Sequence, residues 1–119
     1  MSEPKRYQGG CHCGKVRYEA TTDLARVIEC NCSHCSRKGF LLSFVTPDAF
    51  TLLAGDGELT EYQFNKHVIH HVFCKTCGIQ SFATGAKPDG SRMYMVNVRC
   101  LEGVEPGSYT VTQVDGRSR

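Results

Sequence analysis

The chain has 119 residues, of which 40% are hydrophobic and 22% charged, and its formal net charge is +2. These values are typical of a single globular domain, and no apolar run is long enough to predict a membrane-spanning helix. The lysines and arginines are scattered rather than clustered, and the first residues lack the apolar stretch of a signal peptide. We therefore expect a cytoplasmic protein with reduced thiols and with neither nucleic-acid nor membrane partners.

Short strands dominate the chain. Alternating apolar and polar residues, with many β-branched and aromatic side chains, predict strands over 15–20, 26–30, 40–45, 50–54, 58–64, 68–73, 79–83 and 93–98. One helical turn is expected over 33–38, with Ser33 as its cap. Gly55-Asp56-Gly57 predicts a hairpin, and Lys87-Pro88-Asp89-Gly90 predicts a turn. The expected fold is mainly β, as one domain over 1–119 with flexible ends at about 1–8 and 112–119.

Cysteine is the informative residue type, because seven of the eight cysteines fall in three short groups. The groups are Cys11 with Cys13, then Cys30, Cys32 and Cys35, and finally Cys74 with Cys77, whereas Cys100 stands alone. Disulfides need an oxidising compartment, and cysteines one or two residues apart pair poorly with each other. A tight turn instead aims their thiolates at a single ion. This chemistry favours zinc over an iron–sulfur cluster or Cu(I). A thioredoxin-like redox role for Cys74 and Cys77 is a weaker alternative, because that motif should open a helix after a strand, and here Gly78 follows directly.

Seven thiolates divide naturally into four and three. A structural zinc ion has four protein ligands, whereas a catalytic one keeps three and leaves one position open. Cys30, Cys32 and Cys35 can form a tripod from one turn, and the other four cysteines would then join two distant loops. An alternative closes the tripod with His34 or His12.

The three groups with their flanking residues resemble one known family. Gly10-Cys11-His12-Cys13-Gly14-Lys15-Val16-Arg17-Tyr18, Cys30-Asn31-Cys32-Ser33-His34-Cys35 and Phe73-Cys74-Lys75-Thr76-Cys77-Gly78 are similar, in order and spacing, to the glutathione-dependent formaldehyde-activating enzymes. The resemblance implies a β-tent fold of small antiparallel sheets stapled by zinc, a fold shared with centromere-protein-V-like proteins. It also implies the four-plus-three division, with Cys11, Cys13, Cys74 and Cys77 on a structural zinc ion and Cys30, Cys32 and Cys35 on a catalytic one.

The family's reaction is the addition of glutathione to formaldehyde, so the resemblance implies a carbon–sulfur lyase with two zinc ions and with small thiol and carbonyl substrates. An open zinc position would suit this chemistry, because a free thiol is mostly protonated at neutral pH. His34 is a candidate for proton transfer. Arg37 and Lys38 are candidates for offsetting the negative charge of a fourth thiolate. The alternative for each of these three side chains is an ordinary surface residue without a functional role.

Other residues and functions remain open alternatives. His70 and His71 should point to opposite faces of a strand and therefore not share a ligand, and His67 lies nearby. Aromatic residues at 62, 64 and 94 could line a pocket, but core packing is the simpler interpretation. A non-catalytic, zinc-stapled binding module is the second candidate function. A nucleic-acid-binding zinc ribbon is the third, and the absence of a basic patch counts against it.

Overall fold

The computed structural model describes residues 4–24, 26–63, 69–87, 89–105, 107 and 109–115. Within them the protein is mainly β, as expected, with one short α-helix and three single-turn 3-10 helices. The strands are β1 (Lys5–Gly10), β2 (Arg17–Thr22), β3 (Val27–Cys30), β4 (Leu41–Val45), β5 (Phe50–Ala54), β6 (Leu59–Tyr62), β7 (His70–Cys74), β8 (Phe82–Ala86), β9 (Arg92–Asn97) and β10 (Val111–Val114). The helices are α1 (Ser33–Lys38), η1 (Pro47–Ala49), η2 (Asp56–Glu58) and η3 (Val98–Cys100).

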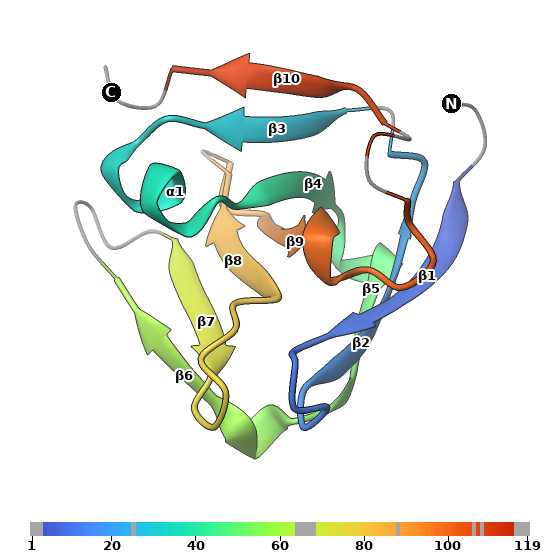
Figure 1. Ribbon diagram of the computed structural model, residues 1–119, viewed down its shortest axis with the longest axis vertical. Coiled ribbons are helices and arrows are strands. Elements are labelled where there is room, and N and C mark those ends of the chain that lie inside the picture. Colours follow the sequence, from blue (N-terminus) through green and yellow to red (C-terminus); the bar gives the residue numbers. More distant parts are fainter. Residues whose placement is uncertain are drawn as a thin grey trace.

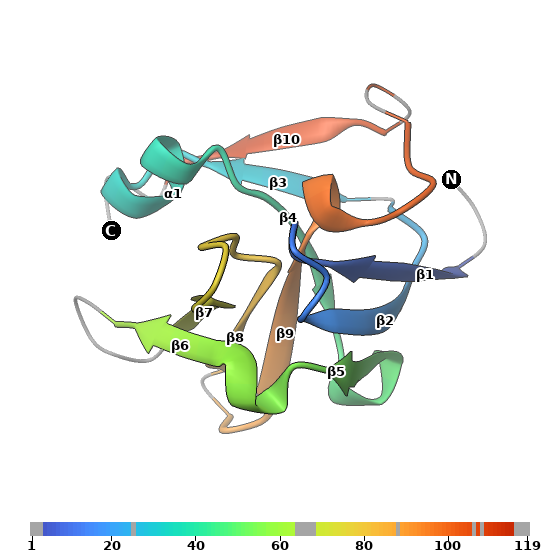
Figure 2. The same cartoon turned by 60° about the horizontal axis from the view of Figure 1, so that its bottom comes forward.

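The strands form two sheets (Figure 1). The smaller sheet has the order β1-β2-β5 and is antiparallel. The larger sheet has the order β10-β3-β4-β9-β8-β7-β6 and is antiparallel except for the pair of β10 and β3, which run parallel. Figure 2 shows β10 and β3 along one side of the molecule and α1 beside them. None of the helices described is long and apolar enough to span a membrane.

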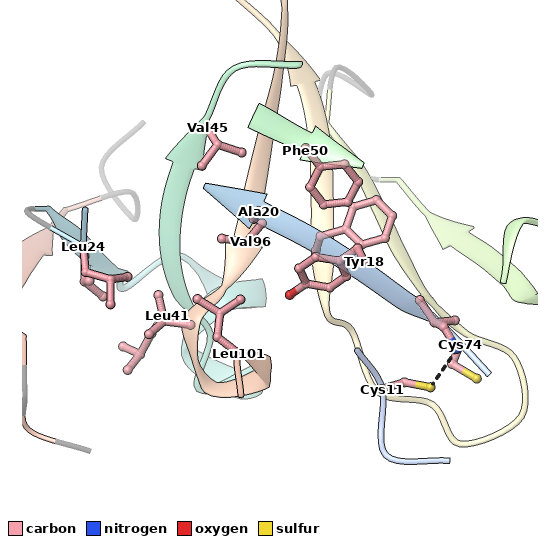
Figure 3. Packing of buried hydrophobic residues seen from close by; sticks show 14 residues of the cluster. Cys11, Tyr18, Ala20, Leu24, Leu41, Val45, Phe50, Cys74, Val96 and Leu101 are labelled. Atoms are coloured by element: carbon pink, nitrogen blue, oxygen red, sulfur yellow. Dashed lines mark hydrogen bonds between the residues drawn. The ribbon is translucent and has the colours of Figure 1, made fainter. Parts of the chain in front are cut away.

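An aromatic core joins the two sheets. Tyr18 of β2 stacks on Phe50 of β5 at 5.1 Å between ring centroids and meets Phe82 of β8 edge-on at 5.7 Å. Phe50 also stacks on Tyr94 of β9 at 4.4 Å. The Tyr18 hydroxyl donates a hydrogen bond of 2.9 Å to the Ser81 carbonyl, so the one buried polar atom of this ring is satisfied. Figure 3 shows Tyr18 and Phe50 among the buried hydrophobic residues, with Cys11 and Cys74 at one end.

Four strands of the larger sheet, β3, β4, β8 and β9, carry buried residues on both faces. Alternate residues along each strand point to opposite sides. One face carries Val27, Leu41, Phe82 and Val96 and packs into the aromatic core. The other face carries their sequence neighbours and packs against Cys35 of α1; these neighbours are Ile28, Leu42, Ala83 and Met95. We call this second face the α1 face.

Three details differ from the sequence-based expectations. Gly55-Asp56-Gly57 does not form a hairpin, because β5 and β6 belong to different sheets. The cap of α1 is Cys32 rather than Ser33, since the Cys32 side chain accepts the N–H of Cys35. Part of each end expected to be flexible, 5–8 and 112–114, lies in β1 and β10, whereas 1–3 and 116–119 lie outside the described residues.

Candidate metal centres

The first group of cysteines joins two loops that are distant in sequence. Cys11 and Cys13 lie in the turn between β1 and β2, and Cys74 and Cys77 lie at the end of β7 and in the turn after it. All four Sγ atoms lie within 4.8 Å of one another. The Cys13 Sγ is 3.6 Å from the Sγ atoms of both Cys11 and Cys74. Four sulfurs bound tetrahedrally to zinc at 2.3 Å would be about 3.8 Å apart, so this group fits a zinc ion.

Backbone N–H groups surround the sulfurs of this four-cysteine group. Val16 donates to the Cys11 Sγ at 3.4 Å, and Thr76 and Cys77 donate to the Cys74 Sγ at 3.4 and 3.5 Å. The hydrogen bond from the Cys77 N–H is the main reason that the pKa of the Cys74 thiol lies below its ordinary value, since it outweighs the effect of burial. These N–H groups therefore favour the thiolate form of Cys74, which is the form that binds metal.

The second group comes from one short stretch of chain. Cys30 ends β3, Cys32 caps α1, and Cys35 lies in the first turn of that helix with its side chain buried. Their three Sγ atoms also lie within 4.8 Å of one another. No fourth cysteine, histidine or carboxylate joins this group within the part of the chain described. The geometry is therefore that of a three-ligand site.

The three-cysteine group is electrostatically unbalanced without a cation. Burial alone would raise the pKa of Cys32, but hydrogen bonds from the backbone N–H and side chain of Cys35 lower it. Burial raises the pKa of Cys35, and the neighbouring Cys32 and Cys30 sulfurs raise it further. Three sulfurs this close cannot all ionise readily unless a positive ion offsets their repulsion. A soft divalent ion such as zinc fits this set of donors.

The two groups lie on opposite faces of the seven-stranded sheet, and strand alternation explains why. In β7, Cys74 and Val72 point into the aromatic core, where Cys74 belongs to the four-cysteine group. The alternate residues His71 and Phe73 therefore face the other way, toward α1 and the three-cysteine group. Two contacts show this directly, from His71 to His34 and from Phe73 to Lys38.

The two histidines considered as extra ligands belong to neither group. His12 is exposed, and its ring nitrogens do not join the sulfurs of Cys11 and Cys13. The His34 ring lies between α1 and the sheet, where it contacts the His71 ring at 4.1 Å and stacks on the Tyr62 ring at 5.7 Å. The alternative in which His34 closes the tripod is therefore not supported by the structure.

The two basic residues considered for charge balance differ in their surroundings. The Arg37 guanidinium donates to the Ser33 carbonyl of its own helix at 2.8 Å and is exposed. The Lys38 ammonium lies 5.5 Å from the centre of the Phe73 ring. Partial burial lowers the pKa of Lys38, while the charge of Cys35 acts in the opposite direction. Lys38, rather than Arg37, is thus the cation in electrostatic reach of the three-cysteine group.

The sequence reasoning considered His71 only as a strand residue and did not consider Gln80, although the His71 ring contacts that of His34, the residue before Cys35. His71 and Gln80 are both buried, and the Gln80 Nε2 lies 3.5 Å from the His71 Nδ1. Alternation did predict that His71 and His70 point to opposite faces, and His70 indeed pairs with Glu61 at 3.0 Å, away from the site. No local pattern could show which face α1 would cover.

The remaining candidates have other surroundings. Tyr94 belongs to the aromatic core, as expected. Tyr62 is half exposed and stacks on His34. The Cys100 thiol is half-buried and lies 3.9 Å from the Gln80 carbonyl, outside both cysteine groups. His67 and Phe64 lie outside the described residues.

Comparisons with known proteins agree with these observations. Residues 6–112, which include all seven grouped cysteines, match the model of the family described as glutathione-dependent formaldehyde-activating enzyme. Among solved structures, the crystal structure of a Rhodobacter sphaeroides protein matches with a TM-score of 0.76 and 34% sequence identity. This match covers 88% of the present chain and 99% of the other.

Proposed function

Because the chain belongs to the glutathione-dependent formaldehyde-activating enzyme family, we propose that it is a zinc-dependent carbon–sulfur lyase. Its proposed reaction is the reversible addition of glutathione to formaldehyde or a related small carbonyl compound. The observation that carries the proposal is the three-cysteine group, whose sulfurs converge without a fourth ligand among the described residues. The four-cysteine group offers a complete set of four ligands and would hold the structural zinc ion.

In the proposed reaction, a bond forms between the glutathione sulfur and the carbonyl carbon. The carbonyl π electrons move to oxygen, and the proton lost by the thiol ends on that oxygen, so that atoms and charge balance. A zinc ion with an open position would supply the Lewis acidity that lowers the pKa of a thiol placed there. Reversal of the same step breaks the carbon–sulfur bond.

The chain's own residues have distinct proposed roles. Cys30, Cys32 and Cys35 hold the ion, and Lys38 offsets part of the negative charge that accumulates when a fourth thiolate arrives. His34 directly precedes Cys35 and its ring contacts that of His71, so its imidazole is a candidate to hold or pass on the proton.

The first test measures metal content by mass spectrometry in wild type, Cys32→Ser and Cys100→Ser. We expect two zinc ions per chain in wild type and in Cys100→Ser, which alters a cysteine outside both groups, and one in Cys32→Ser. Cobalt substitution then gives a visible spectrum that reports thiolate binding. Glutathione should change this spectrum in wild type and in Cys100→Ser only.

Catalysis is tested next with ¹³C-formaldehyde and glutathione, followed by NMR. Wild type should accelerate formation and breakdown of the adduct, and Cys32→Ser should not. Two zinc ions with no glutathione response, or no acceleration for any small aldehyde, would instead favour the non-catalytic binding module.

A further inference from the structure

The α1 face carries a connected set of polar side chains beside the three-cysteine group. Gln80 contacts His71, and His71 contacts His34, which directly precedes Cys35. His71 and Tyr62 are direct partners in the antiparallel pair of β7 and β6. Their two rings therefore form neighbouring parts of one wall, and the His34 ring lies against both.

The hydrogen bonds of Gln80 define which His71 nitrogen carries the proton. The Gln80 Nε2 lies 3.4 Å from the Phe82 carbonyl, which can only accept, so the amide nitrogen rather than the amide oxygen must point there. The same Nε2 is 3.5 Å from the His71 Nδ1. That nitrogen must then be an acceptor, and the proton of a neutral His71 lies on Nε2. Burial, together with the nearby charges of His34 and Lys38, lowers the pKa of His71 to about 4 and keeps the ring neutral.

A glutamine at position 80 lowers the folding stability relative to an apolar side chain. Its side chain is 4% exposed, and its Oε1 is buried with no hydrogen-bond partner among the described residues. A buried acceptor without a partner destabilises a fold, whereas an apolar side chain of similar length would avoid that cost. The amide therefore points to a role in orienting His71 rather than in packing.

We propose that His71, held by Gln80 in its Nε2–H tautomer, is a positioning residue that fixes the His34 ring beside the three-cysteine group. The role resembles that of outer residues that orient the ligands of metal sites. This inference rests on the proposed function in one respect, namely that His34 takes part in the reaction.

The test compares Gln80→Met and His71→Phe with wild type and with His70→Phe. Methionine keeps the length of Gln80 and removes its amide, and phenylalanine keeps the ring of His71 and removes its nitrogens. His70 is the matched control, because it is the adjacent histidine on the opposite face and pairs with Glu61.

The first measurement is the NMR of ¹⁵N-histidine in the zinc-loaded protein, which reports the proton position and ring order without any substrate. Wild type and His70→Phe should show His71 protonated on Nε2 and a single His34 ring environment. In Gln80→Met, His71 should lose its single tautomer. In both test variants the His34 signals should broaden or split.

The second measurement is adduct formation from glutathione and formaldehyde. We expect kcat to fall by about 10-fold or more in both variants, as for other residues that orient a metal site. The KM for glutathione should change less, both zinc ions should remain, and Gln80→Met should melt no lower than wild type. A simple structural role predicts the opposite for Gln80→Met, namely lower melting with kcat retained.

Two further results would overturn the inference. One is a wild-type His71 protonated on Nδ1, and the other is a His34 signal identical to wild type in both variants. Neither depends on activity. A wild type without any adduct formation would overturn the proposed function instead, and the histidine signals would still decide this inference.

Discussion

At the scale of single residues, Lys38 and Arg37 are neighbours in sequence but differ in what their charges can reach. The Lys38 ammonium faces Phe73 and the three-cysteine group, whereas Arg37 binds a carbonyl of its own helix. We predict that Lys38→Ala weakens glutathione binding by about two- to five-fold, in line with a partly exposed charge pair of about 0.5–1 kcal/mol. Arg37→Ala should leave the affinity unchanged.

Titration of the cobalt spectrum with glutathione measures both affinities. The lysine effect should shrink at high salt, because exposed charges are screened. Equal affinities in wild type and both variants would show that neither cation offsets the charge of the bound thiolate.

The buried His71 makes stability depend on pH. Burial and the neighbouring His34 and Lys38 lower its pKa from 6.5 to about 4 in the folded protein. Above pH 6.5 the ring is neutral in both states and has no effect. Between pH 6.5 and 4 the unfolded state binds the proton more readily, so the folded state loses stability as the pH falls, and the loss levels off below pH 4.

Urea unfolding of wild type and His71→Phe between pH 7.5 and 4 checks this prediction. Acid also releases metal from cysteines, but it does so in both proteins, so the difference between their free energies of unfolding isolates the histidine. That difference should fall through this window. A constant difference would mean that the folded protein protonates His71 as easily as the unfolded chain does.

At the scale of elements, the segment between β5 and β6 supports the four-cysteine group. Gly55 has a φ of 101°, and a Cβ on it would lie 2.6 Å from the Lys15 carbonyl in the turn after Cys13. We predict that Gly55→Ala destabilises the protein by about 1–3 kcal/mol, because the backbone and the neighbouring turn are both strained.

Gly57 is the matched control for this prediction. A Cβ on Gly57 meets nothing within 4 Å, and its φ is not positive, so Gly57→Ala should be neutral or slightly stabilising. Urea unfolding at pH 7.5 compares the two. Similar free energies of unfolding for both variants would show that the Gly55 contact with Lys15 can relax.

The same segment shows where sequence reasoning works and where it fails. Tight spacing predicted the convergence of Cys30, Cys32 and Cys35, because residues two or three apart meet through local geometry. The joining of Cys11 and Cys13 to the distant Cys74 and Cys77 followed instead from the number of cysteines left over and from the family resemblance. Gly55-Asp56-Gly57 was misread as a hairpin because its glycine permits a close approach to a loop 40 residues earlier. The strands β1 and β10 were missed because distant partners define them, as β10 pairs with β3.

At the scale of the whole molecule, the two cysteine groups should differ in what their metal does for stability. The four-cysteine group joins the β1–β2 turn of the small sheet to β7 of the large one. The three-cysteine group lies within one continuous stretch of six residues. A crosslink between distant segments constrains the unfolded chain more than a local one.

We therefore predict that Cys77→Ser lowers Tm by about 10 °C or more, since losing roughly 3 kcal/mol of metal-linked stability shifts Tm by about 4 °C per kcal/mol. Cys32→Ser should lower it far less. Scanning calorimetry with metal analysis of each sample measures both. Chelation of wild type should approach the Cys77→Ser value, and equal losses from the two variants would contradict the assigned structural role.

The opposite orientation of neighbouring β7 side chains has a consequence for how this sequence can diverge. His71 and Phe73 contact His34 and Lys38 on the side of the three-cysteine group, while Cys74 belongs to the four-cysteine group on the other face of the sheet. Inserting or deleting a single residue between 71 and 74 would turn one set of side chains through to the wrong face. Single substitutions in this stretch leave the orientation of its other side chains unchanged, whereas a change in its length does not. Insertions and deletions between relatives should therefore fall in the connecting loops.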